Sequence, residues 1–297
     1  MVQSLYLPIC NVTITMKKQP EIEVKLGLIN NIKFELNMAE TDEKLTDLNG
    51  LPVSVPVLYS SYLRGFRNIL STWPNQGKTV GEWIQHLCSI SQLKLCYVKV
   101  FHVRDIELDT QTLRNIFPKL GNIDLIFSHA EANEHDVLSA QNVLKAFLSD
   151  AKHIRLRNVP FQDHFSIQHI GMGNLKELNM ESPRNLNVHD LSTLNAERIS
   201  IDTDQLSLRD LNRFFKLWKK GSNPKLKELT IYWDTEIRPD WNVLLKRLKA
   251  ITKRNSRKQK LTIRNCRGVC GKIWCDWSDA NLYVEFRMSK KFSRKHF

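Results

Sequence analysis

The sequence contains little of several features that would place it in a special class. Its 297 residues include only 11 Gly and 10 Pro, too few for a linker, a collagen-like chain or a low-complexity protein. The longest apolar runs, such as residues 51–58, fall far short of the roughly 20 residues that span a bilayer. No segment joins a basic start to a long apolar stretch, as a signal peptide does. We therefore expect neither a membrane-spanning nor a secreted protein.

Sequence motifs of common enzymes are also missing. The chain has no phosphate-binding glycine-rich loop, no dinucleotide-binding glycine pattern, no nucleophile elbow and no paired-histidine zinc motif. The densest group of acids and imidazoles consists of His129, Glu131, Glu134 and His135, which match no familiar metal-ligand spacing. We interpret this group as a solvated loop, and we expect a protein that is not an enzyme and needs no cofactor.

The cysteines are sparse and indicate free thiols. The chain has six: Cys10, Cys88, Cys96, Cys266, Cys270 and Cys275. They lack the tight spacing of a secreted disulfide scaffold, which favours an intracellular protein of the cytoplasm or nucleus. The last three could ligate zinc, but no fourth ligand is obvious, so we predict no metal site.

The charge is distributed unevenly. The net charge of the chain is +13. Residues 246–297 alone hold 16 basic and 3 acidic residues, which is also +13, so residues 1–245 are neutral. Such a local excess bears on binding partners rather than on the fold.

Apolar alternation dominates the start of the chain. Residues 12–16, 21–26 and 32–36 alternate apolar and polar side chains, which predicts half-buried strands. Residues 1–50 are therefore predicted as an N-terminal strand region, and residues 51–78 as a connecting segment. Helices are predicted at 79–90, 109–117, 139–149, 207–219 and 240–253, each from its apolar stripe.

From residue 98 onward, short strand-like pieces recur. Their centres are spaced 21 to 32 residues apart, at 99, 124, 155, 179, 200, 230 and 262, with candidate helices between several of them. This rhythm predicts an α/β fold, specifically an irregular leucine-rich-repeat-like solenoid of short strands and helices. A plain α/β domain with a parallel sheet is the alternative. Alternation around residues 261–264, 272–274 and 282–286 predicts antiparallel capping strands at the C-terminus.

The densest basic run is Lys253, Arg254, Arg257, Lys258 and Lys260, which we predict as a loop between a helix and a strand. It could bind an anionic surface or nucleic acid. Tryptophans concentrate in the same part of the chain and could stack bases, although packing in a core explains them better.

One segment carries a family resemblance. Residues 206–229 run from a Leu-Asn helix start through a tryptophan to Gly-Ser-Asn-Pro-x-Leu and a strand. This pattern resembles the signature of the F-box-associated domain, type 2, a family greatly expanded in nematodes. Its signature positions here are Asn212, Trp218, Gly221, Ser222, Asn223, Pro224 and Leu226. The resemblance covers about residues 79–287, which we predict as one domain followed by a basic tail at 288–297.

The resemblance implies a protein-recognition role. In this family the domain usually follows an F-box, which docks the linker subunit of a cullin-RING ubiquitin ligase, and it looks like the substrate receptor. No helical F-box is visible in residues 1–45, so we do not expect tight binding to the linker subunit. The implied partner is a protein substrate of unknown identity, and the alternative is a nucleic-acid or anionic-surface binder. The binding face would carry Arg155, Asn179, Ser200 and Thr230, or else the opposite strand face.

Overall fold

The computed structural model of the chain describes residues 9–27, 30–39, 43–61, 66–74, 77–90, 97–117, 119–129, 131–160, 170, 173–183, 186–234, 240–254, 258–278 and 281–289. It divides the chain into two compact units, residues 1–151 and 152–297, and each contains strands and helices. The predicted α/β class is therefore confirmed. The division falls inside the segment 79–287, which we had predicted as one domain.

The first unit is built around a central strand, β1, that pairs antiparallel with one neighbour and parallel with the other. β1 pairs antiparallel with β2, which begins a meander through β3, β4 and β5, and it pairs parallel with β6, which is followed by β7. Its elements are β1 (Ile9–Met16), β2 (Glu21–Leu26), β3 (Asn30–Glu35), β4 (Ser54–Ser61), β5 (Phe66–Pro74), α1 (Val80–Ile90), β6 (Tyr97–His102), η1 (Val103–Asp105), α2 (Thr110–Ile116), β7 (Asn122–Ile126) and α3 (Glu134–Phe147).

The N-terminal alternation was interpreted correctly. Val12, Ile14 and Met16 are at most 1% exposed, and their polar neighbours are partly exposed, as a half-buried strand requires. Residues 51–78 were predicted wrongly as a connecting segment, because they form β4 and β5. Pro56 lies within β4 and Pro74 ends β5, and each is paired with a residue of the other strand.

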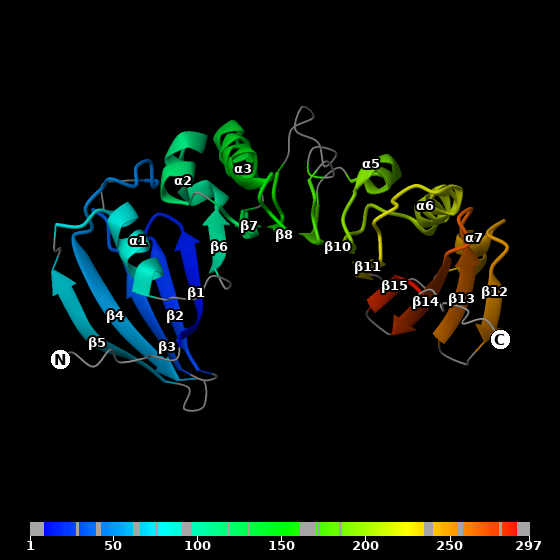
Figure 1. Ribbon diagram of the computed structural model, residues 1–297, viewed down its shortest axis with the longest axis horizontal. Helices are drawn as coiled ribbons and strands as arrows, with labels where there is room; N and C mark the ends of the chain where they lie inside the picture. The colour runs from blue at the N-terminus through cyan, green and yellow to red at the C-terminus, as the bar shows by residue number, and fades with distance from the viewer. Residues whose placement is uncertain are drawn as a thin grey trace, which may run out of the picture. The chain divides into compact units, whose positions relative to one another are not determined.

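The second unit combines a parallel and an antiparallel part in one sheet (Figure 1). β8, β9, β10 and β11 are parallel neighbours in chain order, and β15, β14, β13 and β12 continue from β11 in antiparallel pairs. The elements are β8 (His153–Arg157), β9 (Glu177–Glu181), α5 (Val188–Thr193), β10 (Arg198–Asp202), α6 (Leu208–Lys220), β11 (Glu228–Asp234), α7 (Trp241–Leu245), β12 (Ile251–Arg254), β13 (Lys258–Arg264), β14 (Cys270–Ser278) and β15 (Asn281–Met288).

Helix starts follow their sequence signals. The Thr79 hydroxyl accepts a hydrogen bond from the Glu82 N–H at 3.2 Å, and the Glu82 carboxylate accepts one from the Thr79 N–H at 2.8 Å. Ser207 and Asp210 make the same reciprocal pair at the start of α6. Such capping boxes satisfy backbone donors that a helix leaves unpaired.

One predicted helix is much shorter than expected. The apolar stripe predicted a helix over residues 240–253, but α7 ends at Leu245 and residues 251–254 form β12. The Asp240 side chain caps the helix start by accepting from the Asn242 N–H at 3.0 Å. The residues beyond α7 pair instead with β13, so the sheet overrides the local helical pattern.

The core of the second unit lies between the helices and one face of the sheet, and Figure 1 shows α5, α6 and α7 on the same side of its strands. Phe214, Phe215 and Trp218 of α6 are at most 1% exposed. The Trp218 ring meets the ring of Phe286 on β15 edge-on, with centroids 4.8 Å apart. The antiparallel strands therefore extend the same apolar core that the parallel strands begin.

Candidate functional site

The predicted binding residues lie in one row across the strands of the second unit. They lie on the face of the sheet opposite to α5, α6 and α7, which we call the open face. Arg155 pairs in register with Asn179, Asn179 with Ser200, and Ser200 with Thr230. The residues that flank them along each strand, such as Ile199 and Ile201, are buried under the helices. The structure thus decides which strand face is exposed, a choice that the sequence left open.

Ion pairs cover the parallel part of the open face. The Glu177 carboxylate lies 3.0 Å from the Arg198 guanidinium and 3.4 Å from His153 Nδ1, each on a neighbouring strand. The hydrogen bond from Arg198 holds the pKa of Glu177 below its ordinary value, although burial raises it. Arg155 pairs in the same way with Glu181. Charges of both signs therefore lie side by side on β8, β9 and β10, and most of the cations pair with an acid on a neighbouring strand.

Aromatic side chains and cations occupy the antiparallel part of the open face. Tyr232 of β11 is 45% exposed, and its ring lies 6.1 Å from the ring of Tyr283 on β15. The Tyr283 hydroxyl donates to Asp276 at 3.1 Å. Farther along, the Lys260 ammonium lies over the Trp274 ring, 5.4 Å from its centroid. This part offers large flat side chains, which the parallel part lacks.

The sequence did not single out Tyr232 or Tyr283. They lie more than fifty residues apart in the chain and become neighbours because β15 returns to pair with β11. The alternation around residues 282–286 predicted the strand, and the exposed position of Tyr283 follows from that alternation. Its partner strand could not be derived from a local pattern.

The predicted basic run forms a hairpin rather than a helix-to-strand loop. Lys253 and Arg254 belong to β12, Lys258 and Lys260 belong to β13, and Lys253 is opposite Lys260 in register. The error has the same origin as the overlong helix, because residues 251–254 joined the sheet. Arg257 lies outside the described residues, as does the basic tail beyond residue 289.

The family signature ends a helix and begins a strand. Gly221 has φ +105°, the left-handed conformation that a helix C-terminus favours in glycine. Its N–H donates to the Trp218 carbonyl at 3.0 Å, and the Ser222 N–H donates to the Leu217 carbonyl at 3.2 Å. These two bonds form a Schellman motif, which satisfies carbonyls at the end of α6.

Two buried asparagines in the signature connect neighbouring helices of the second unit. The Asn212 amide donates to the carbonyls of Leu244 and Lys246 at 2.6 and 2.9 Å, and so holds the end of α7. The Asn223 amide donates to the Leu194 carbonyl at 2.7 Å, just beyond α5. Asn223 also adopts a left-handed φ of 49°, which asparagine tolerates. Both roles are structural.

The remaining signature residues complete this turn. Pro224 is exposed and follows Asn223, where it prevents the helix from continuing. Leu226 is fully buried and precedes β11, and Trp218 is 1% exposed. The signature residues therefore hold the fold together, and they place no reactive group on the surface.

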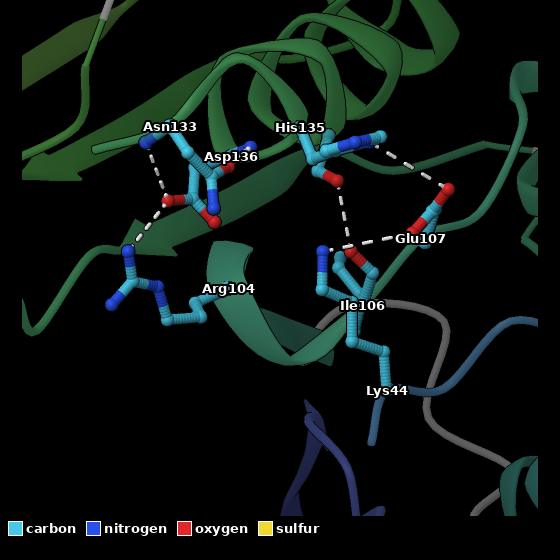
Figure 2. Close-up of polar contacts among 8 residues, drawn as sticks. Lys44, Arg104, Ile106, Glu107, Asn133, His135 and Asp136 are labelled. Atoms are coloured by element: carbon cyan, nitrogen blue, oxygen red, sulfur yellow. Dashed lines mark hydrogen bonds and ion pairs between the residues drawn. The ribbon is translucent and has the colours of Figure 1, made fainter. Parts of the chain in front are cut away.

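Polar contacts surround the start of α3 in the first unit, near the group of acids and imidazoles (Figure 2). His135 and Lys44 lie near the Glu107 carboxylate, at 3.9 and 3.6 Å. Arg104 pairs with Asp136 at 3.0 Å. Burial raises the pKa of Asp136, but the hydrogen bonds from Arg104 and from the Asn133 N–H, together with the nearby positive charges, outweigh burial and leave the pKa lowered.

The predicted candidates for metal binding do not come together. No cluster of three or more His, Cys, Asp or Glu side chains able to hold a metal occurs among the described residues. The ring of His129 is tilted against that of Phe127, with centroids 5.8 Å apart. Glu131 precedes α3, whereas Glu134 and His135 belong to α3 and not to the loop that we predicted. Cys275 is buried, whereas Cys266 is exposed. Burial raises the pKa of the Cys275 thiol to about 12, which keeps it protonated and unreactive.

Comparisons with known proteins give one match. The family described as F-box associated matches residues 166–231, which contain β9, β10, α6 and the signature turn. No curated protein and no solved structure matches the chain. In the described part of the chain, no helix has the length and apolar character needed to cross a membrane. The match confirms the resemblance that the signature indicated: residues 166–231 match the family described as F-box associated.

Proposed function

We propose that the second unit is a non-catalytic protein-recognition module and that its open face binds the partner. The observation that carries the proposal is the exposed polar face on the parallel strands. Parallel sheets are usually covered on both faces. Here Arg155, Arg198 and Asp202 are exposed on one face, and the described helices lie on the other.

The finer architecture in this proposal is an irregular solenoid. β9–α5–β10 and β10–α6–β11 are successive strand–helix–strand units, and each new strand pairs parallel with the one before it. Solenoids of this kind present an extended strand surface to their partners. The antiparallel strands would then close the apolar core at the end of the array.

The match to the F-box-associated family supports a role in substrate recognition. In that family the domain is expected to select the protein that a ubiquitin ligase modifies. The present chain would supply the selecting surface, and linkage to the ligase would depend on a docking module. We expect the chain by itself not to co-purify stably with the ligase linker subunit.

Two serine substitutions test the open face. Ser200 is half-buried in the middle of that face, and Ser192 is half-buried on α5, on the helical side. Ser200→Arg should remove partner capture in a quantitative affinity purification followed by mass spectrometry, because it adds a long charged side chain in the centre of the face. Ser192→Arg should leave the captured set unchanged.

The outcomes separate the proposal from its rivals. Loss of one dominant protein with Ser200→Arg alone supports recognition through the open face. Equal capture by both variants and the parent would reject that face. Recovery of nucleic acid as the dominant partner would favour the alternative function of an anion-binding protein, which the charge of residues 246–297 supports.

A further inference from the structure

Helix α6 carries a row of cations on its outer side. Arg209, Arg213, Lys216 and Lys220 are spaced at i, i+4, i+7 and i+11, so they fall on one side of a helix with 3.6 residues per turn. Arg209, Arg213 and Lys220 are exposed, and Lys216 is half-buried. The opposite side of the helix contains the buried aromatic residues of the core.

The turn after α7 brings more cations beside this row. The amide of Asn212 holds the Lys246 carbonyl, and the Lys219 ammonium donates to the Leu248 carbonyl at 2.5 Å. These two anchors fix residues 246–248 along α6 between positions 212 and 219. Arg247 therefore lies alongside the middle of α6, next to the row of cations.

The backbone of this turn is held in an unusual conformation. Arg247 and Lys249 have φ values of 60° and 51°, in the left-handed region that non-glycine residues rarely adopt. Leu248 between them is fully buried, and both cations are exposed. The fold thus maintains two strained positions while exposing a positive charge at each.

Among the described residues, most cations of this cluster have no acidic partner. Within the described residues, Arg213 has an ion pair with Asp210 at 3.5 Å, and no ion pair joins an acid to Lys216, Lys220, Lys246, Arg247 or Lys249. No Asp or Glu occurs in the sequence from 211 to 227 or from 241 to 275. Neighbouring like charges repel one another, so an anionic partner would relieve the repulsion.

An apolar side chain borders the row on the side away from the turn after α7. Leu217 follows Lys216, is one turn from both Arg213 and Lys220, and is 39% exposed. We propose that Arg213, Lys216, Lys220, Lys246, Arg247 and Lys249, with Leu217 beside Arg213 and Lys220, bind an acidic peptide segment of a partner protein. We call these residues the helical basic surface. It is separate from the open face and does not depend on the function proposed for that face.

The apolar residue favours a peptide over other polyanions. The phosphate backbone of a nucleic acid offers no apolar group to meet Leu217, and the described surface provides no base-reading motif. A membrane interface takes up an extended apolar helix face, whereas α6 uses its apolar side chains in its own core. A peptide with carboxylates around one apolar side chain matches both the charges and the leucine.

The test measures binding of defined probes to the full chain by fluorescence anisotropy. The probes are a labelled peptide of glutamates with a central leucine, the same peptide with glycine instead of leucine, and an oligothymidylate of equal charge. Vesicles of phosphatidylcholine and phosphatidylserine are tested by sedimentation. We expect the leucine peptide to bind tighter than the glycine peptide, the oligothymidylate and the vesicles.

Matched variants locate the site. Arg213→Gln, Lys216→Gln and Lys220→Gln together should weaken peptide binding by about tenfold or more, because they remove the central charges. Arg254→Gln, Arg257→Gln and Lys258→Gln remove the same number of charges from the basic hairpin and should have a much smaller effect. Leu217→Gln should equalise binding of the leucine and glycine peptides.

A second pair of substitutions avoids disturbing α6. Arg247→Asn and Lys249→Asn together remove two charges, and asparagine tolerates the left-handed backbone of both positions. Weaker peptide binding by this variant, with an unchanged melting temperature, supports the site. The proposal is wrong if the hairpin variant loses as much binding as the α6 variant, if the Asn variant binds like the parent, or if the oligothymidylate or vesicles bind tighter than the leucine peptide.

Discussion

The two faces of the sheet in the second unit differ in their side chains, although both are formed by the same strands. One face is apolar and buried, and the other is polar and exposed. On the face under the helices, Ile199, Ile201 and Phe286 are at most 1% exposed and contact other apolar groups. On the open face, Arg198 and Glu177 pair across strands while remaining in contact with water. The first arrangement is driven by removal of apolar surface from water, and the second adds little stability.

This difference separates the residues that stabilise the fold from the residues that we propose bind a partner. The signature that resembles the F-box-associated family lies on the covered side, where Trp218 and Asn212 hold elements together. The open face can change its side chains without disturbing the core, because each strand residue points to one face only. A family can therefore keep one fold and vary its partners.

The largest expected loss of stability comes from a substitution on the face covered by the helices. Trp218→Ala should lower the free energy of unfolding by about 3–5 kcal/mol, the usual cost of truncating a large buried aromatic residue. Denaturation by urea, followed by circular dichroism, measures it. A variant as stable as the parent would show that Trp218 does not support the core.

A substitution of a glycine on β14 should cause the next largest loss of stability. A Cβ on Gly271 would lie 2.7 Å from Phe286 Cζ and 3.1 Å from Trp218 Cη2, so Gly271→Ala should cost about 1–3 kcal/mol through overpacking. Gly121 has open space around a new Cβ and no left-handed φ, and Gly121→Ala serves as the control. Equal melting temperatures for the two variants would contradict the packing of β14 against α6.

The stability contributed by each face can be compared by replacing one asparagine on the covered side and one on the open face. Asn212→Ala on the covered side removes both donors to the end of α7 and should cost about 1–3 kcal/mol, because buried carbonyls lose their partners. Asn179→Ala on the open face removes one hydrogen bond, at 3.3 Å to Glu177, and should cost about 0.5 kcal/mol or less, because water replaces it. Equal losses would show that the open face is covered in solution.

A small effect is also expected for an ion pair on the open face. Glu177→Gln should cost no more than about 1 kcal/mol near neutral pH, as exposed pairs do. Arg198 lowers the pKa of Glu177 in the folded state, so the stabilisation is present above the ordinary pKa of 4.5 and is lost as the pH falls through the lowered value. Urea titrations of parent and variant should converge at acidic pH, and a difference that grows on acidification would refute this assignment.

Much of the local structure could be predicted from the sequence. The alternation of Val12, Ile14 and Met16 predicted β1, and the Thr79–Glu82 capping box predicted the start of α1. The Gly221–Pro224 turn predicted the end of α6. These signals act within a few residues, through backbone donors, side-chain periodicity and the φ preference of glycine, so neighbouring residues are sufficient to specify them.

The secondary-structure predictions were wrong where residues distant in the sequence determine whether a segment becomes a strand. Residues 240–253 were predicted as one helix, but the pairing of residues 251–254 with β13 makes these residues a strand. Residues 51–78 contain prolines and yet form β4 and β5, because β3 offers β4 a partner. In each case hydrogen bonds to another strand outweigh a weak local preference.

The sequence alone determined the α/β class, the signature turn around Gly221 and the excess of positive charge in residues 246–297. Only the tertiary structure decided that Ser200 and Thr230 face outward and that Arg247 lies beside α6. Composition and local periodicity are properties of the chain, and they survive any arrangement of its elements. The exposure of a strand face and the clustering of charges depend on which elements pack together, and that is set by burial of apolar surface over the whole unit.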